Sequence, residues 1–548
     1  MHRIAATPGG WNPDTDGVII LDQTPAPIVI LTAADTEIQT LVASLPRLPH
    51  DFPEFRVASL LQLQQELSID TYVDSVLSKA KVIVVRLLGG RSYWSYGLER
   101  LREIAEFYDI SLVVLPGDDR PDPVLCSLGT VPLTVADKLW HYFVEGGAEN
   151  LAYGLQYLAQ TCLDYSYEVP EPQAVPQWGE YVWERGRGGK EERGQQPTIA
   201  IFFYRAHYLS GNTRVIDALC ESLQARGFNP LPLFLSSLRN PEIQAQLLTE
   251  LTKDQSIDLV LNTTGFSLAK LTSESPQVDF WQTLDVQVIQ VMLGGGSEDQ
   301  WQQQWRGLSP RDIAMNVALP EVDGRIISRA VSFKAVQTDH PQLETTVMAY
   351  EPKPDRIEFV ADLAANWVTL RCTTVEQRKV ALILANYPNK DGRLANGVGL
   401  DTPASCLEIL RSLQSAGYTL GSITPEEILS ATSADLINWL TQGVTNDPEG
   451  QDMRPVRQIL SARDYQAYFQ TLPAPVQQGV IERWGDVPPD ADIPIAGIQL
   501  GNIFVGIQPS RGYDDDPSLN YHAPDLEPTH RYLAFYAWLR FQWGAQAV

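Results

Sequence analysis

The feature that most constrains the fold is a recurring alternation of short β-branched runs with longer amphipathic stretches. Residues 27–34, 81–88 and 110–116 are apolar runs of strand length. Residues 93–109, between the last two runs, place apolar side chains at helical spacing. Strand–helix–strand alternation of this kind predicts a parallel sheet with helices on its faces. We therefore expect a multidomain α/β protein built from several parallel-sheet units with flanking helices.

The alternation recurs along the chain, and 548 residues exceed what a single hydrophobic core holds. A stretch rich in proline, glycine and charge without periodicity marks the clearest boundary, because such composition is typical of linkers. We expect an N-terminal α/β domain at 1–164, a linker or insertion at 165–197, a second α/β domain at 198–350 and a third unit at 351–548.

The charge balance limits the partners of the chain. A formal net charge of −26 argues against nucleic acid and anionic membrane surfaces, and it is compatible with a cationic substrate such as a metal ion. The five cysteines are spread singly, which indicates a reducing compartment. There is no apolar leader at the N-terminus and no apolar run of membrane-spanning length. We expect a cytoplasmic protein without a membrane span.

Acids and histidines concentrate in residues 501–533, near the end of the chain. The stretch contains Arg511, Asp514, Asp515, Asp516, His522, Asp525 and His530. One interpretation is a solvated acidic turn, and a calcium cage is a second, although the regular DxDxDG spacing is missing. The histidines that follow the acids favour a third interpretation, an open site that holds a divalent cation briefly.

A second group of polar residues follows the predicted strands of the middle domain. Tyr204, His207 and Asn212 come after a strand that begins near residue 198, and residues 262–265 and 294–296 form polar or glycine-rich turns after later strands. Open α/β sheets bind ligands at the carboxyl ends of their strands, which is where these turns fall. The alternative for His207 is a hydrogen-bonded turn histidine.

Gly89 and Gly90 precede a predicted helix, as the glycines of a phosphate cradle do. The GxGxxG and Walker A patterns are both absent, so tight turns are the simpler interpretation. The chain shows no ATPase machinery of its own.

Three long strings resemble a known family. They are RLLGGRSYWSYGLERL at 86–101, NYPNKDGRLANGVGLDTPAS at 386–405 and GNIFVGIQPSRGYDDDPSLNYHAPDLEPTHRYLAFYAWLR at 501–540. They are similar to the cobaltochelatase large subunit, CobN, whose family includes the H subunit of magnesium chelatase. The resemblance implies ATP-dependent insertion of Co²⁺, as a substrate, into a corrin-type tetrapyrrole similar to hydrogenobyrinic acid diamide, in cobalamin biosynthesis. It also implies AAA+ ATPase and adaptor partner subunits, which would use ATP and Mg²⁺ in place of this chain.

The resemblance also assigns site residues. In the magnesium branch the corresponding loop resembles GYEGDP, so that Asp514 takes the position of its Glu and Asp516 that of the following acid. On this basis we predict Asp514, Asp516, His522 and His530 as catalytic residues, with Asp514 and His522 as metal ligands. The predicted substrate-binding residues are Arg86, Gly89, Gly90, Tyr204, His207, Asn212, Asn389, Asn396, Arg511 and Tyr513.

Members of the family are more than twice as long, and a strand with an HxGKHGT-like motif is expected after residue 548. Residues 351–548 are then expected to begin the chelatase core, and the chain is expected to be an N-terminal fragment. Two alternatives stay open: an H-type magnesium chelatase subunit that binds protoporphyrin, and a non-catalytic tetrapyrrole- or metal-binding protein without the C-terminal half. The strings YHAPD and RSYWSYG favour the cobalt branch.

Overall fold

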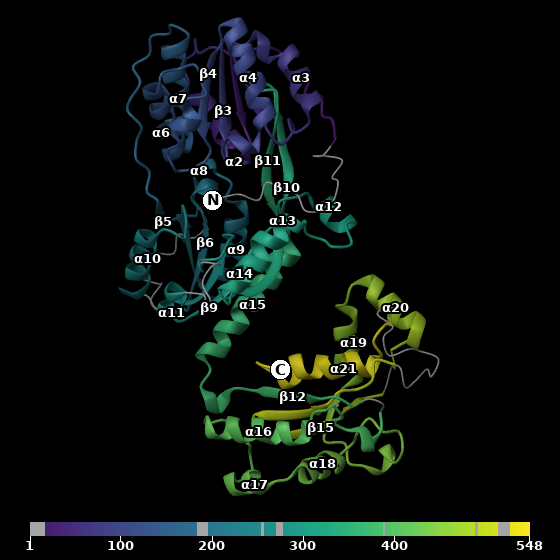
Figure 1. The fold of residues 1–548 in the computed structure, drawn as a ribbon. Helices are drawn as coiled ribbons and strands as arrows, with labels where there is room; N and C mark the ends of the chain where they lie inside the picture. Colours follow the sequence, from purple (N-terminus) through teal and green to yellow (C-terminus); the bar gives the residue numbers. More distant parts are fainter. Residues whose placement is uncertain are drawn as a thin grey trace. The chain divides into compact units, whose positions relative to one another are not determined.

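The computed structural model describes residues 17–183, 196–253, 257–269, 278–386, 389–397, 399–487, 491–512 and 526–548. The chain divides into two compact units, Met1–Val368 and Thr369–Val548. Both units combine helices with β-sheets, and parallel strand pairs occur in each (Figure 1). The predicted α/β class is therefore confirmed. The finer division at residues 164, 197 and 350 stays a prediction.

The first sheet is fully parallel, with the strand order β2-β1-β3-β4. Its strands are β1 (Ile28–Thr32), β2 (Phe55–Ser59), β3 (Val82–Leu87) and β4 (Ser111–Pro116). The helices α3 (Glu66–Ser75) and α4 (Ser95–Tyr108) cover one face. The helices α2 (Asp35–Ser44), α6 (Leu133–Glu145) and α7 (Gly147–Cys162) cover the other. The helices α6 and α7 are separated at Gly146, whose φ of 67° cannot continue a helix.

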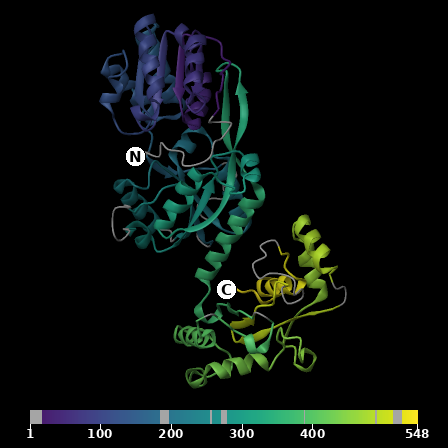
Figure 2. The same cartoon turned by 45° about the vertical axis from the view of Figure 1, so that its right-hand side comes forward.

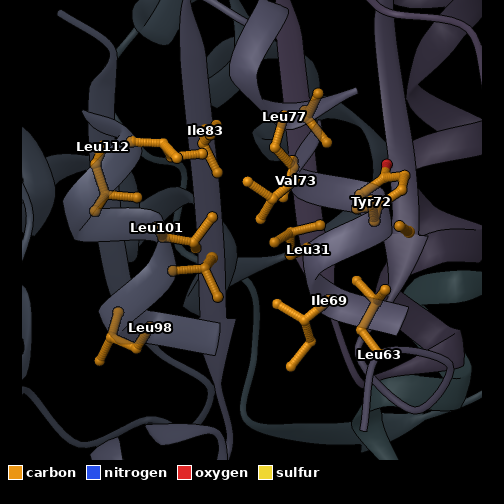
Figure 3. Close-up of a cluster of buried hydrophobic side chains, with 14 of the residues drawn as sticks. Leu31, Leu63, Ile69, Tyr72, Val73, Leu77, Ile83, Leu98, Leu101 and Leu112 are labelled. Carbon is orange, nitrogen blue, oxygen red and sulfur yellow. The ribbon is translucent and has the colours of Figure 1, made fainter. Parts of the chain in front are cut away.

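The core of this layer forms because successive residues of each strand point to opposite faces. Figure 3 shows Leu31, Ile83 and Leu112, which come from three different strands and contact the apolar sides of α3 and α4. Val73 and Leu101 supply the helical side of the cluster, and all five side chains are almost fully buried. Packing on both faces explains why these strands read as continuous apolar runs.

The second sheet has seven strands in the order β11-β10-β9-β8-β6-β7-β5. Its parallel centre consists of β6 (Thr198–Tyr204), β7 (Asn229–Leu235), β8 (Ile257–Asn262) and β9 (Gln287–Leu293). The strand β10 (Ile326–His340) extends this centre by pairing in parallel with β9. The antiparallel edge strands are β5 (Trp178–Glu180) on one side and β11 (Thr345–Pro352), which forms a hairpin with β10, on the other. The covering helices are α9 (Arg214–Ala225) and α15 (Pro354–Cys372) on one face, and α10 (Pro241–Lys253) and α11 (Asp279–Leu284) on the opposite face.

The β10–β11 hairpin, which the sequence patterning did not predict, reaches beyond its own sheet to the first one (Figure 2). Leu343 and Val347 are buried in the core of the first layer. The backbone N–H of Val57 donates to the carbonyl of Leu343 at 3.5 Å. Glu344 accepts from the backbone N–H of Thr24 at 2.6 Å and lies 3.3 Å from the guanidinium of Arg56. The hairpin therefore ties the two sheets of the N-terminal unit together.

The C-terminal unit contains a three-stranded and a two-stranded sheet. In the first, β12 (Val380–Leu384) pairs in parallel with β16 (Ile503–Ile507), which pairs antiparallel with β15 (Gly497–Leu500). In the second, β13 (Gln458–Leu460) pairs with β14 (Ile493–Ile495). The helices are α16 (Thr402–Ser415), α17 (Pro425–Ser430), α18 (Ser433–Thr441), α19 (Ala462–Gln470), α20 (Ala474–Trp484) and α21 (His530–Ala537), which continues as π-helix over Trp538–Trp543. No helix within the described ranges is long and apolar enough to cross a membrane.

Candidate functional site

The carboxyl ends of the first two sheets face each other within the N-terminal unit (Figure 1). The helix α8 (Arg205–Ser210), which directly follows β6, packs against α2 and α7 of the first layer. The guanidinium of Arg205 donates to the carbonyl of Val144 at 3.1 Å and to that of Glu145 at 2.8 Å. We call this boundary the interdomain seam. It is defined by Asp35, Glu37, Arg86, Tyr204, His207, Lys334 and Tyr350.

The strand order of both sheets reverses at the seam. In the first sheet, β1 continues to β2 on one side and β3 to β4 on the other, so the reversal lies between β1 and β3. In the second sheet it lies between β6 and β8 by the same reasoning. Open α/β sheets bind ligands outside the carboxyl ends of the strands at such reversals. Arg86 near the end of β3 and Tyr204 at the end of β6 therefore occupy ligand-binding positions of the two sheets.

Arg86 is a buried cation at the seam, with 4% of its side chain exposed. Its Nη2 lies 2.9 Å from a carboxylate oxygen of Glu37 in the first turn of α2. The other oxygen of Glu37 accepts from the hydroxyl of Thr32 at 2.5 Å. The ring of Phe143 covers the guanidinium, with its centroid 4.8 Å away. Nε and Nη1 of Arg86 are buried and have no hydrogen-bond partner among the described residues.

His207 lies on the opposite side of the seam, where its ring is 5.4 Å from that of Tyr350 and 6.4 Å from that of Tyr204. Burial, with a smaller contribution from the nearby ammonium of Lys334, lowers the pKa of His207 to about 4. The imidazole is therefore neutral near pH 7. Its Nδ1 is buried and has no hydrogen-bond partner in the part of the chain that the structure describes. The side-chain oxygen of Asn212 accepts from the backbone N–H of Tyr350 at 3.2 Å, which orients this side chain beside β11.

Tyr204 is held by the turn that follows β8. Its hydroxyl accepts from the backbone N–H of Gly265 at 3.1 Å, and burial raises its pKa to about 12. Next to it, the side-chain amide of Asn262 donates to Gln290 at 2.8 Å, and Arg325 donates to the same Gln290 oxygen at 3.0 Å. The polar turn predicted at 262–265 is thus part of a buried hydrogen-bond network.

Asp323 anchors this network. Its carboxylate lies 2.6 Å from a guanidinium nitrogen of Arg325, and both side chains are almost fully buried. It also accepts from the hydroxyl of Ser267 at 2.5 Å and from the backbone N–H of Leu268 at 2.8 Å. Burial alone would raise the pKa of Asp323, but these hydrogen bonds and the charge of Arg325 lower it below the usual value. The carboxylate is therefore ionised and orders the chain after β8.

A groove with a volume of about 800 Å³ lies at the carboxyl ends of β3 and β4. Gly89 and Gly90, two predicted binding residues, form part of its wall, and their φ angles of 100° and 76° favour glycine. Arg91 and Arg120 contribute positive charge to the lining, whereas Asp118 contributes negative charge. The glycines therefore form a turn beside an open, mixed-charge groove.

Asn389 and Asn396, also predicted to bind substrate, lie in the loop after β12. The neighbouring carboxylate of Asp391 accepts from the hydroxyl of Thr445 at 2.8 Å and pairs with the guanidinium of Arg454. Asn396 is exposed. The loop thus has a fixed base and presents Asn396 to solvent.

His530 starts α21 and is buried in the C-terminal unit. Its Nε2 lies 3.0 Å from the carbonyl oxygen of Gly485 and its Nδ1 lies 2.7 Å from the hydroxyl of Tyr465. Because a carbonyl can only accept, Nε2 donates to Gly485, and Nδ1 accepts from Tyr465. Both nitrogens are occupied, so a catalytic role requires one of these bonds to break. The guanidinium of Arg511 donates to the carbonyl of Leu526 at 2.7 Å.

Four of the predicted site residues lie outside the described residues. They are Tyr513, Asp514, Asp516 and His522. Their roles as metal ligands, catalytic groups or substrate contacts stay predictions, as does the catalytic role of His530. In the ranges that are described, no group of three or more His, Cys, Asp and Glu side chains could hold a metal ion.

Sequence reasoning missed several residues of the seam. Asp35 and Glu37 directly follow the first predicted strand, so their place at its carboxyl end was a usable signal. Lys334 and Tyr350 face each other across the unpredicted hairpin. Nothing in the local pattern placed them near His207.

Comparisons with known proteins identify the family. A family model described as CobN/Magnesium Chelatase matches residues 140–548. The chain is 42% identical over 558 residues to the aerobic cobaltochelatase subunit CobN of Pseudomonas aeruginosa, and the match covers 100% of this chain and 44% of that protein. It is 40% identical over 573 residues to the protein of the same name from Sinorhizobium sp, covering 100% and 43%.

A solved structure is also similar. The catalytic subunit of cobaltochelatase from Mycobacterium tuberculosis matches with a TM-score of 0.69 and 30% identity, over 95% of this chain and 42% of that one. The chain belongs to the CobN/magnesium chelatase family, which confirms the resemblance. It spans less than half the length of the curated relatives it matches.

Proposed function

We propose that the chain acts in the large subunit of an ATP-dependent cobaltochelatase in the cytoplasm. It binds a corrin-type tetrapyrrole similar to hydrogenobyrinic acid diamide and receives Co²⁺ for insertion in cobalamin biosynthesis. The observation that carries the proposal is 42% identity over the whole chain to an aerobic cobaltochelatase subunit. AAA+ ATPase and adaptor subunits use ATP and Mg²⁺ in this proposal, in keeping with the absence of a Walker A motif here.

Metal insertion requires that the ring lose its inner N–H protons while the ion sheds water. In the proposed mechanism Asp514 and Asp516 hold the cation or accept those protons, and Asp514 and His522 are metal ligands. His530 assists only if its ring leaves Tyr465 or the carbonyl of Gly485, because both nitrogens are otherwise engaged.

Two groups of residues contact the tetrapyrrole in this proposal. Those of the N-terminal unit are Arg86, Gly89, Gly90, Tyr204, His207 and Asn212, and those of the C-terminal unit are Asn389, Asn396, Arg511 and Tyr513. Support for the first group comes from the neutral imidazole of His207 and from the Arg86 nitrogens that no described residue engages. Side chains of this kind suit the carboxylate and amide periphery of a corrin ring.

The decisive experiment is Asp514→Ala in the complete complex. Cobalt insertion should be abolished, because the proposed ligand and proton acceptor is lost, whereas tetrapyrrole binding measured by absorbance should stay nearly unchanged. Asp452→Ala, which removes an exposed acid elsewhere in the C-terminal unit, is the matched control and should leave insertion intact. Insertion at the normal rate in Asp514→Ala would contradict the assignment.

A magnesium chelatase subunit that binds protoporphyrin is the second candidate, since the matching family model also includes magnesium chelatase. The two candidate functions differ in the macrocycle that the protein binds, a corrin-type ring or protoporphyrin. Titration with a corrin precursor and with protoporphyrin should show saturable binding of the corrin alone, and saturable binding of protoporphyrin alone would reverse the order of the two candidates.

A further inference from the structure

The interdomain seam contains buried side-chain nitrogens that form no hydrogen bond with any described residue. Nε and Nη1 of Arg86 and Nδ1 of His207 are buried, and none has a partner among the described residues. A guanidinium N–H can only donate, so the two Arg86 atoms require an acceptor. Buried polar groups in folded proteins are nearly always hydrogen-bonded, which makes unused donors at a ligand-binding position informative.

The place of Arg86 in its sheet supports a ligand. Its side chain points to the same face as that of Val84, since strand residues alternate, and it stands where the order reverses between β1 and β3. The corresponding reversal of the second sheet lies across the seam at Tyr204. The reversal points of the two sheets thus lie at carboxyl ends on the two sides of the seam, and each is the position where such sheets bind ligands.

The present partner of Arg86 leaves the guanidinium incompletely paired. Glu37 contacts only Nη2, at 2.9 Å, because its second oxygen is taken by the hydroxyl of Thr32. Arginine and carboxylate pair best through two parallel hydrogen bonds. A second carboxylate could therefore bind at the unpartnered Nη1, and through Nη1 and Nη2 together if Glu37 releases Nη2 and keeps its bond with Thr32.

Arg56 provides an internal comparison. It is a buried arginine on the adjacent part of the same sheet, near the amino end of β2 and away from the seam. Its Nη1 donates to the carbonyl of Gln342 at 3.0 Å and its Nη2 to the hydroxyl of Thr24 at 2.7 Å. Both terminal nitrogens of Arg56 are used by the protein, whereas Nη1 of Arg86 has no partner among the described residues. The Nε atoms of both arginines are buried without such a partner, so Nη1 is the atom that distinguishes Arg86.

We propose that the interdomain seam binds a small molecule that carries carboxylates, with the guanidinium of Arg86 as its anchor and Glu37 as the internal competitor for that anchor. The carboxylates belong either to a free organic acid or to the side arms of a tetrapyrrole, and the proposal does not rest on metal insertion. At the anchor a carboxylate group fits better than a phosphate, because it brings one negative charge to the guanidinium beside Glu37, whereas phosphate concentrates about two charges at the same point.

Access to Arg86 requires a local movement. Its unused nitrogens are shielded from solvent, and the ring of Phe143 lies over the guanidinium. Rotation of this ring, together with release of Nη2 by Glu37, exposes the anchor. Binding is therefore expected to be slower than diffusion, since the competent arrangement is a minor one.

The test is calorimetric titration of the whole chain with propane-1,2,3-tricarboxylate, its neutral triamide and inorganic phosphate. The tricarboxylate should bind saturably, and the triamide and phosphate should not. Arg86→Gln should weaken binding by about tenfold or more, since a charge-assisted hydrogen bond is lost. Glu37→Gln should tighten it by roughly threefold or more, because the competing negative charge is removed. Arg56→Lys, the matched control, should leave the affinity unchanged.

The opposite effects of the two seam variants separate binding from stability, because a general loss of folding cannot tighten binding. If Arg86→Gln fails to fold, Glu37→Gln alone decides the question. Uroporphyrin, a macrocycle with carboxylate arms, identifies the source: competition with the tricarboxylate supports tetrapyrrole arms, and binding of the tricarboxylate alone supports a free acid. Absence of saturable binding, equal binding of phosphate, or an unchanged affinity in Glu37→Gln overturns the proposal.

Discussion

The ammonium nitrogen of Lys334 lies 2.6 Å from a carboxylate oxygen of Asp35, so that the long hairpin of the second sheet is ion-paired with the first turn of α2. The two side chains are 26% and 18% exposed. Burial alone would lower the pKa of Lys334, but the charge of Asp35 and its hydrogen bond, together with a contribution from Tyr350, outweigh burial and raise the pKa. The pair is therefore charged on both sides and stabilises the seam.

Lys334→Met should lower the free energy of unfolding of the N-terminal unit by about 1–3 kcal/mol, between the values for exposed and for buried pairs. Chemical denaturation measures this loss. The matched control is Lys353→Met, which removes a more exposed pair with Glu298 and should cost less than about 1 kcal/mol. A double-mutant cycle with Asp35→Asn that shows no coupling between Lys334 and Asp35 contradicts this prediction.

His207 should make the N-terminal unit less stable in mild acid. Its folded pKa of about 4 lies below the ordinary 6.5, so the unfolded state binds the proton more readily and stability falls as the pH drops from about 6.5 towards 4. The loss at about pH 5 should be at most roughly 2 kcal/mol, because the ring is only partly buried. Denaturation midpoints measured across this pH range give the loss of stability. In His207→Gln most of this dependence of the free energy of unfolding on pH should disappear.

The exposed His141 is the control, since His141→Gln should leave this dependence on pH unchanged. Lys334→Met should also raise the pKa of His207, because a nearby positive charge is removed, and NMR titration of the ring reads this directly. A pKa of His207 near its ordinary value in the wild-type chain is the result that rules the prediction out.

Tyr465→Phe should destabilise the C-terminal unit by about 1–3 kcal/mol, because the buried Nδ1 of His530 loses its donor. Thermal or chemical unfolding measures the effect. Tyr468→Phe, on the same helix, is the control and should cost less than about 0.5 kcal/mol. If the hydrogen bond contributes nothing, the two variants will be equally stable.

Asp323→Asn should lower the free energy of unfolding by about 3–5 kcal/mol, the largest loss among these substitutions. The reason is that the buried guanidinium of Arg325 is left without its charge partner. The double variant with Arg325→Met should recover part of the loss. Since the folded pKa of Asp323 is lowered, its stabilisation is complete above the ordinary pKa of 3.8 and is lost only as the pH falls further. An Asp323→Asn chain as stable as wild type above pH 3.8 is incompatible with this account.

Several elements could be predicted from the sequence because their pattern is local. The strands β1, β3 and β4 are buried on both faces and therefore appear as unbroken apolar runs. The strand β2 has the same environment, but Arg56 interrupts its run, and the strand was missed. The β10–β11 hairpin was missed because its far end packs on the other layer and follows no single alternation.

The residues of the candidate site also divide into those that could be predicted from the sequence and those that could not. Tyr204 and His207 were predicted because they end or follow a strand, where parallel sheets bind ligands, and Arg86 was predicted from the family resemblance. Lys334 and the role of Glu37 could not be predicted, since they depend on how two sheets meet. The acids at 514–516 lie outside the described residues, so their proposed metal site still rests on the family resemblance.

The sequence by itself determined the α/β class and the family, because apolar periodicity and long characteristic strings are properties of neighbouring residues. Only the tertiary structure decided that Arg86 pairs incompletely with Glu37 and that both nitrogens of His530 are engaged. Those facts depend on strand order, on register and on which side chain lies within hydrogen-bond distance of a buried polar atom. Such long-range choices are made by packing and hydrogen-bond satisfaction over the whole unit, and local sequence does not contain them.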